Sequence, residues 1–229
     1  MEYREAGVTS RNYLSPTILV SPIVVFGSIT HHFTHPAAGI IHTAGQQFGT
    51  LGIMHKLLLN RDIYTEFVQS ELPEARRFLW IVTADIKDLY ISVDGVFQPL
   101  LELLSDLVVK GVAVRLIHAK EPGPRFREEF DRFDALISSE LFERILCPRV
   151  HTKAIVIDGI RAFVGSANLT GAGLGSKHEH KRNFEAGFLF DDQHDIQQLM
   201  QWIDSLYLGE QCVDCRRRAY CADPIIDHV

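Results

Sequence analysis

The sequence of 229 residues predicts an α/β domain, in which helices cover a central β-sheet. Two continuous apolar runs, at 78–83 and 112–117, are typical of strands buried on both faces. Amphipathic segments with helical periodicity alternate with these runs along the chain. A hydrophobic content of 46% fits a globular protein with one sizeable core. The net charge of −6 argues against coating of nucleic acid by the whole surface, so any nucleic-acid binding is local.

The first 53 residues differ from the rest because no Lys, Arg, Asp or Glu occurs between Arg11 and Lys56. The apolar stretch 17–26 is too short to span a bilayer and is a poor signal peptide. We expect residues 1–53 to be a poorly ordered or loosely docked extension, or to precede a genuine start at Met54. Residues 54–209 then form the main domain, for which the motif described below predicts catalysis, and 210–229 a Cys-rich tail. The absence of an export signal leads us to expect a cytoplasmic protein.

The main domain begins with a helix expected near residues 57–71, before the strand at 78–83. A helix at 100–109, the strand at 112–117, a helix with an apolar Phe stripe around 126–133 and a strand near 141–147 follow. A strand at 184–190 and a helix near 196–206 complete the domain. His118 ends a strand and could face a site, although a structural role is the simpler interpretation. The charges of Asp85, Lys87 and Asp88 suit a loop.

A β-hairpin is predicted where two β-branched runs, 154–157 and 162–164, flank Asp158-Gly159, a dipeptide suited to a turn with positive φ. Just before it, His151 and Lys153 are two residues apart and should point to the same side. A histidine can attack phosphorus or move a proton, and a lysine can neutralise phosphoryl oxygens. Ser166 and Asn168 follow the second strand with the same spacing and could add hydrogen bonds. The pattern indicates phosphate chemistry.

These residues resemble a known family. His151-x-Lys153-x4-Asp158, followed by Gly165-Ser166-x-Asn168, is similar to the signature of the phospholipase D (HKD) superfamily. The resemblance is specific over residues 149–190 and implies an α/β fold with a mixed β-sheet flanked by helices. It also implies metal-independent cleavage of a phosphodiester through a covalent phosphohistidine, so no cofactor is expected for catalysis.

The resemblance assigns a role to each motif residue. His151 is the nucleophile or the acid, Lys153 and Asn168 bind phosphate, and Ser166 supports them. Glu185 orients a histidine. Asp158 belongs to the catalytic signature, but its place in the turn leads us to expect a structural role.

One feature departs from the larger members of the superfamily, which carry two copies of the motif. This chain has one, and a single motif cannot supply both nucleophile and acid. A twofold homodimer would bring two copies of His151 to a shared site, as in the single-motif nucleases of this superfamily. We therefore predict a homodimer.

Positive charge is concentrated shortly after the motif. The turn-rich, flexible stretch 169–175 leads into a basic segment that we expect to bind substrate through Lys177, His180, Lys181 and Arg182. The alternative is an ordinary solvated loop.

The tail contains three of the four cysteines as Cys212-x2-Cys215-x5-Cys221. C-x2-C spacing suits a structural metal, with zinc ahead of an iron–sulfur cluster. Cys147, four residues before His151, is the expected fourth ligand, and His228 is the alternative. Disulfides and free thiols are the competing interpretations.

The substrate follows from these features taken together. A nuclease is the first hypothesis, since a single motif, a dimer and a basic segment agree with it. A phospholipid-processing enzyme is the second, although no membrane association is expected. The third is a catalytically silent protein that binds nucleic acid or acts as a scaffold, which the intact His151, Lys153 and Asn168 oppose.

Overall fold

The computed structural model describes residues 54–222 and 224–225. The predicted extension at 1–53 and His228, the alternative metal ligand, lie outside these residues. The division of the chain into an extension, a catalytic domain and a tail therefore stays a prediction.

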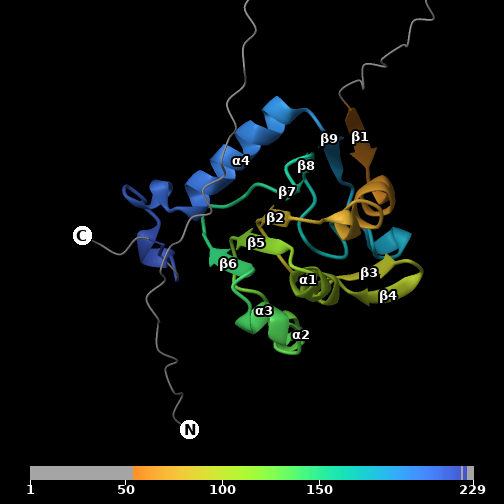
Figure 1. Cartoon of the computed structure of the whole chain (residues 1–229), viewed down its shortest axis with the longest axis horizontal. Coiled ribbons are helices and arrows are strands. Elements are labelled where there is room, and N and C mark those ends of the chain that lie inside the picture. Colours follow the sequence, from red (N-terminus) through yellow and green to blue (C-terminus); the bar gives the residue numbers. More distant parts are fainter. Residues whose placement is uncertain (1–53, 223, 226–229) are drawn as a thin grey trace, which may run out of the picture. The chain divides into compact units, whose positions relative to one another are not determined.

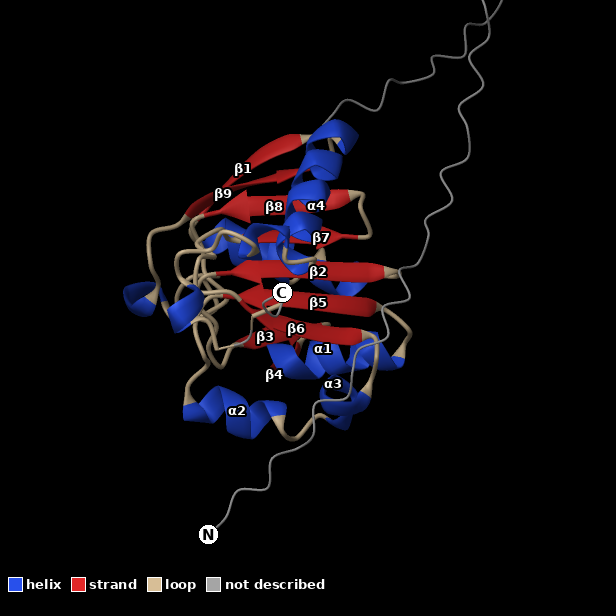
Figure 2. Ribbon diagram, turned by 90° about the vertical axis from the view of Figure 1, so that its left-hand side faces the viewer, coloured by secondary structure: helices blue, strands red, loops and turns tan. Residues whose placement is uncertain are grey.

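The described residues form a seven-stranded sheet in the order β1-β9-β8-β7-β2-β5-β6, together with a separate hairpin, β3–β4 (Figures 1 and 2). The strands are β1 (His55–Leu59), β2 (Phe78–Thr83), β3 (Tyr90–Val93), β4 (Val96–Pro99), β5 (Ala113–His118), β6 (Phe142–Leu146), β7 (Ala154–Ile157), β8 (Arg161–Gly165) and β9 (Ala186–Phe190). The α-helices are α1 (Leu100–Val109), α2 (Pro124–Phe130), α3 (Asp134–Ser138) and α4 (Gln193–Tyr207).

The sheet is mixed, as the family resemblance implied. Strands β2, β5 and β6 are parallel to one another, whereas β7, β8, β9 and β1 each pair antiparallel with the preceding neighbour in the sheet. The carboxyl ends of β2, β5, β6 and β8 therefore meet the amino ends of β7 and β9 at one edge. We call this edge the site edge, because the motif residues lie there.

Helices cover both faces of the sheet (Figure 1). Helix α1 and a short π-helix at Ile63–Val68 pack on one face, and α4 packs on the other. Alternation along β7 distributes its side chains between the two cores: Ile155 and Ile157 belong to the first, and Ala154 and Val156 to the second. All four residues are buried, which explains why β7 is a continuous apolar run.

The turn of the predicted hairpin adopts the expected conformation, with φ of +55° at Asp158 and +72° at Gly159. The buried Asp158 carboxylate accepts hydrogen bonds from three backbone N–H groups, those of Arg76 (2.9 Å), Arg77 (2.7 Å) and Phe78 (2.9 Å). These groups lead into β2, so Asp158 attaches the β7–β8 hairpin to the adjacent strand. It lies at the end of β7 opposite the site edge, in agreement with a structural role.

Two parts of the predicted secondary structure are corrected. The helix expected at 57–71 is correct only in part: residues His55–Leu59 form β1, and helical structure covers 61–68, mostly as the π-helix Ile63–Val68. The three leucines of β1 are compatible with both helical and strand periodicity. Pairing with β9 stabilises the strand. The β3–β4 hairpin was not predicted, although Asp94 and Gly95 form a positive-φ turn like that of Asp158-Gly159.

In the part of the chain that the structure describes, no helix has both the length and the apolar character needed to cross a membrane.

Replacing Asp158 with Ala should lower the free energy of unfolding by about 2–4 kcal/mol, because buried N–H groups lose a charged acceptor. Asp158→Asn is the matched control, since Asn tolerates positive φ and retains one acceptor oxygen, and its loss should be smaller. Urea unfolding of the three proteins measures the difference. Equal stability of wild type and Asp158→Ala would contradict the structural role.

Candidate active site

His151 and Lys153 lie just before β7, at the site edge. The Lys153 ammonium donates a hydrogen bond to the His151 carbonyl (2.5 Å) and is 3.4 Å from each ring nitrogen of His151. Only 8% of Lys153 is exposed, whereas His151 is exposed. The structure thus places the buried ammonium of Lys153 beside the imidazole of His151, which solvent can reach.

Ser166 and Glu185 meet across the ends of β8 and β9. The Ser166 hydroxyl donates to one carboxylate oxygen of Glu185, and the Asn183 amide donates to the other (3.0 Å). The backbone N–H of Ala186 donates to the Ser166 hydroxyl oxygen (3.1 Å). Both oxygens of Glu185 are therefore engaged within the chain, and no histidine among the described residues hydrogen-bonds to it.

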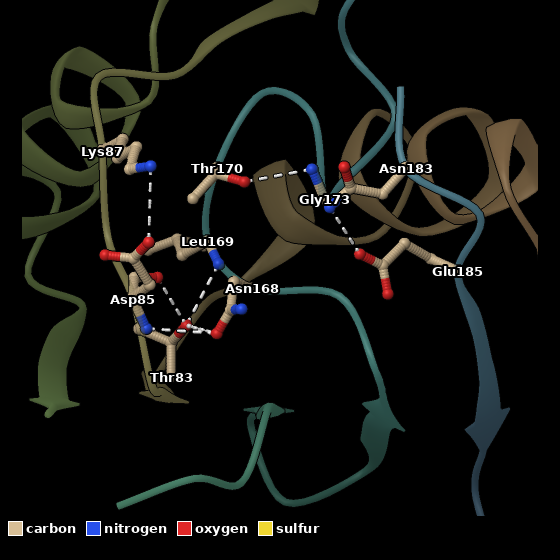
Figure 3. A network of polar contacts seen from close by, with 9 residues as sticks. All are labelled: Thr83, Asp85, Lys87, Asn168, Leu169, Thr170, Gly173, Asn183 and Glu185. Atoms are coloured by element: carbon tan, nitrogen blue, oxygen red, sulfur yellow. Dashed lines mark hydrogen bonds and ion pairs between the residues drawn. The ribbon is translucent and has the colours of Figure 1, made fainter. Parts of the chain in front are cut away.

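Asn168 is held by the end of β2, which sequence reasoning did not foresee (Figure 3). Its side-chain oxygen accepts a hydrogen bond from the Asp85 N–H (3.1 Å) and lies 3.5 Å from the Thr83 hydroxyl, which donates to the Asp85 carbonyl (2.9 Å). The Thr83 oxygen also accepts the Leu169 N–H (3.0 Å). These bonds fix the side-chain oxygen, so the amide nitrogen is free to donate elsewhere. Asp85 also pairs with Lys87 (3.5 Å), which supports the prediction that both are loop charges.

The stretch 169–175 is turn-rich as predicted, and it folds tightly against the Asn168 backbone. The Thr170 hydroxyl accepts the N–H of Gly173 (3.0 Å). A Cβ at Gly173 would lie 2.6 Å from the backbone oxygen of Asn168, whereas one at Gly171 would meet only the side chains of Ser176 and Lys177 at 3.0–3.3 Å. Gly173 thus permits the approach that positions Asn168.

The predicted basic segment is exposed and adjoins the site edge. Lys177, His180, Lys181 and Arg182 are all solvent-accessible, with a 3₁₀ turn at Glu179–Lys181. The segment returns to the fold where the Asn183 N–H donates to the Ala172 carbonyl (3.1 Å), next to the Asn183–Glu185 contact. Its positive charge therefore lies close in sequence and space to Glu185. Binding of substrate by these residues stays a prediction.

His118 ends β5 at the same edge but is fully buried. Its Nδ1 lies 2.8 Å from the Lys120 carbonyl, and its Nε2 has no hydrogen-bond partner among the described residues. Burial lowers the pKa of its imidazole below the ordinary value. The structural interpretation fits this histidine better than a role in contact with substrate.

The tail lies against the loop that carries His151. One cavity of about 230 Å³ lies between the two segments. The His151 loop contributes Cys147, Arg149 and His151 to its lining, and the tail contributes Cys212, Cys215 and Cys221. All four thiols are free. Over residues 54–222 and 224–225, no three His, Cys, Asp or Glu side chains form a ready-made metal site.

The residues of this site lie within a stretch that matches a known protein family. Residues 68–207, more than half of the chain, match the family described as the cardiolipin synthase phospholipase D-like domain. No curated protein matches the chain significantly.

Solved structures are similar to part of the chain. NucT from Helicobacter pylori is similar with a TM-score of 0.50 and 15% identity, over 67% of this chain and 95% of that one. Nuc from Salmonella typhimurium, a phospholipase D family member, has a TM-score of 0.46 and 15% identity, over 67% and 93% of the two chains. Phosphatidylserine synthase from Haemophilus influenzae has a TM-score of 0.44 and 14% identity, over 67% and 37%.

Gly173→Ala should lower the free energy of unfolding by about 1–3 kcal/mol, because the new methyl group has to push the Asn168 backbone away. Gly171→Ala should cost less, since flexible side chains can move aside; neither glycine has positive φ, so the pair isolates the difference in space. Thermal unfolding and a crystal structure of each variant test this. An undisplaced Asn168 in a fully stable Gly173→Ala protein would contradict it.

Protonation of His118 should make stability depend on pH. The pKa of His118 is lowered in the folded protein, so the unfolded chain binds the proton more readily. The free energy of unfolding is therefore at its full value above about pH 6.5 and decreases as the pH falls below that value. The slope can reach about 1.4 kcal/mol per pH unit. Urea unfolding between pH 7.5 and 5 should show less slope in His118→Gln than in wild type, whereas His194→Gln, an exposed control, should retain it. An unchanged slope in His118→Gln would contradict the assignment.

Proposed function

The chain belongs to the phospholipase D superfamily, and from that premise we propose that it is a phosphodiesterase that cleaves nucleic acid through a covalent phosphohistidine. The active site includes His151, Lys153, Ser166, Asn168 and Glu185, and two subunits share it.

The observation that carries the proposal is the burial of Lys153. The residue is 8% exposed, and its ammonium has no ion pair with a carboxylate among the described residues. A buried charge needs an opposite charge or strong hydrogen bonds, and the His151 carbonyl meets that need only in part. A phosphate oxygen placed between Lys153 and the amide of Asn168 would supply it. An imidazole already stands 3.4 Å from the same ammonium.

The chemistry proceeds in two displacements. An imidazole nitrogen of His151 attacks phosphorus, the P–N bond forms, and the bond to the leaving oxygen breaks while that oxygen takes a proton from His151 of the partner subunit. The partner subunit's His151, now neutral, removes a proton from water. The resulting oxygen attacks phosphorus and the P–N bond breaks, which restores the first imidazole. Lys153 and Asn168 stabilise the charge that develops on the phosphoryl oxygens.

The need for a second histidine supports the dimer. His118 also lies at the site edge, but its ring is fully buried and cannot reach a leaving group in solvent. A twofold axis close to the site edge would instead bring His151 of the partner subunit opposite the first. Phe184, next to Glu185, is 97% exposed and gives this edge an apolar group that a partner subunit could cover.

The basic segment supports nucleic acid as the substrate. Lys177 and Lys181 are exposed and Arg182 is half-buried beside the site, where they can contact phosphates on either side of the scissile one. A polymer of phosphates uses such a row of charges more fully than one lipid headgroup does. The overall negative charge fits this view, because binding is then confined to the site edge.

Purified protein should cut labelled single-stranded or double-stranded DNA or RNA in the presence of EDTA, and His151→Ala should lose at least about 1,000-fold in rate. His194→Ala, an exposed histidine on α4, is the matched control and should retain activity. Binding of the same substrates should weaken steeply with salt, because phosphate contacts release counterions. Cleavage of lipid phosphodiesters alone would identify a phospholipid-processing enzyme, and no cleavage with salt-dependent binding retained would identify a silent binding protein.

Mixing subunits tests the shared site. If subunits exchange at random, an equal mixture of wild type and His151→Ala contains about one quarter wild-type dimers, and activity should fall to that level. Independent sites would instead retain half of the activity. A monomer by light scattering at the assay concentration would refute the shared site directly.

A further inference from the structure

The four cysteines of the chain gather at one place although they are far apart in sequence. Cys147 follows β6, and the other three belong to the tail after α4, yet all line the same 230 Å³ cavity. Reciprocal hydrogen bonds join the two segments: the Arg149 guanidinium donates to the Gln211 carbonyl (3.2 Å), and that of Arg217 donates to the Pro148 carbonyl (3.3 Å). Three of the thiols are neighbours in sequence, so the informative placement is that of Cys147, which lines the same cavity as the tail cysteines.

The local backbone at Cys147 and Cys215 has the same form. In each case the N–H three residues on donates to the cysteine carbonyl, from Val150 (3.0 Å) and from Arg218 (3.3 Å). Each of these cysteines therefore begins a tight turn of the backbone.

Charge around the cavity is complementary to thiolates. Arg149 and Arg217 line it, and Arg218 is close enough to act on Cys215. Four thiolates around Zn²⁺ leave a net negative charge, which nearby guanidinium groups offset. Free thiols need no such surroundings.

We propose that Cys147, Cys212, Cys215 and Cys221 bind one Zn²⁺ ion, which fastens the tail to the loop that carries His151. Thiolates are soft ligands, and four of them suit the tetrahedral coordination of structural zinc. Since no three described side chains already form a ready-made group, binding draws the tail closer to Cys147. The ion links position 147 to positions 212–221 and limits movement of the residues that lead to His151.

The test uses the full chain, purified without chelator. Mass spectrometry should find one zinc per chain, and Cys147→Ser and Cys215→Ser should each lose it. Asp214→Asn, which alters a charged side chain between two of the ligands, is the matched control and should retain the metal. Replacement of zinc by Co²⁺ should give the absorption of a tetrahedral thiolate site, which the serine variants lose.

A second measurement covers the case in which a variant fails to fold. Removal of zinc from the wild type should increase hydrogen exchange in residues 147–152, and restoring zinc should reverse the increase. Four reactive thiols in metal-free protein as purified, zinc retained by Cys147→Ser, or iron and sulfide in place of zinc would each overturn the proposal. None of these outcomes depends on nuclease activity, so the proposal and the proposed function can fail separately.

Discussion

The burial of the Lys153 ammonium is the constraint around which the site edge is arranged. A lysine of which 8% is exposed requires a fixed environment, and here it consists of the His151 carbonyl and ring. The strand that follows is buried on both faces, so Lys153 has little freedom to move toward solvent. The position of the charge is therefore determined by the core of the protein, and the imidazole of His151 lies 3.4 Å from it. An anion that enters the site meets groups that need little rearrangement.

Because the sheet contains both parallel and antiparallel strands, one short stretch of the chain can place side chains at the site edge from the ends of several strands. In a purely parallel sheet the amino ends of β7 and β9 would lie at the far edge, away from the end of β2. The antiparallel pairings bring His151, Asn168 and Glu185 to the place where Thr83 and Asp85 complete the hydrogen bonding of Asn168. The site thus combines a local motif with a support that comes from distant sequence.

The sequence predicted the local features well because they depend on neighbouring residues. The Asp158-Gly159 turn, the buried β7 and the pairing of His151 with Lys153 all follow from alternation and turn chemistry. The hydrogen bond from the Asp85 N–H to Asn168 spans 83 residues, and no periodicity reveals such a contact. The strand β1 was missed because its leucines are compatible with both helix and strand, and only β9 decides between them. The approach of Cys147 to the tail was expected from the need for a fourth thiol, and the shared cavity agrees with that expectation.

The two ends of β7 explain why the motif has its particular spacing. Lys153 precedes the strand at the site edge, Asp158 follows it at the opposite edge, and the four residues between them are β7 itself. The four-residue interval in the motif is therefore the length of strand β7. One residue more or fewer would exchange the two faces of the strand and send its side chains into the wrong cores. The Asp158 carboxylate attaches the far end of β7 to β2. It thus helps to fix where Lys153 and His151 lie at the opposite end of the strand.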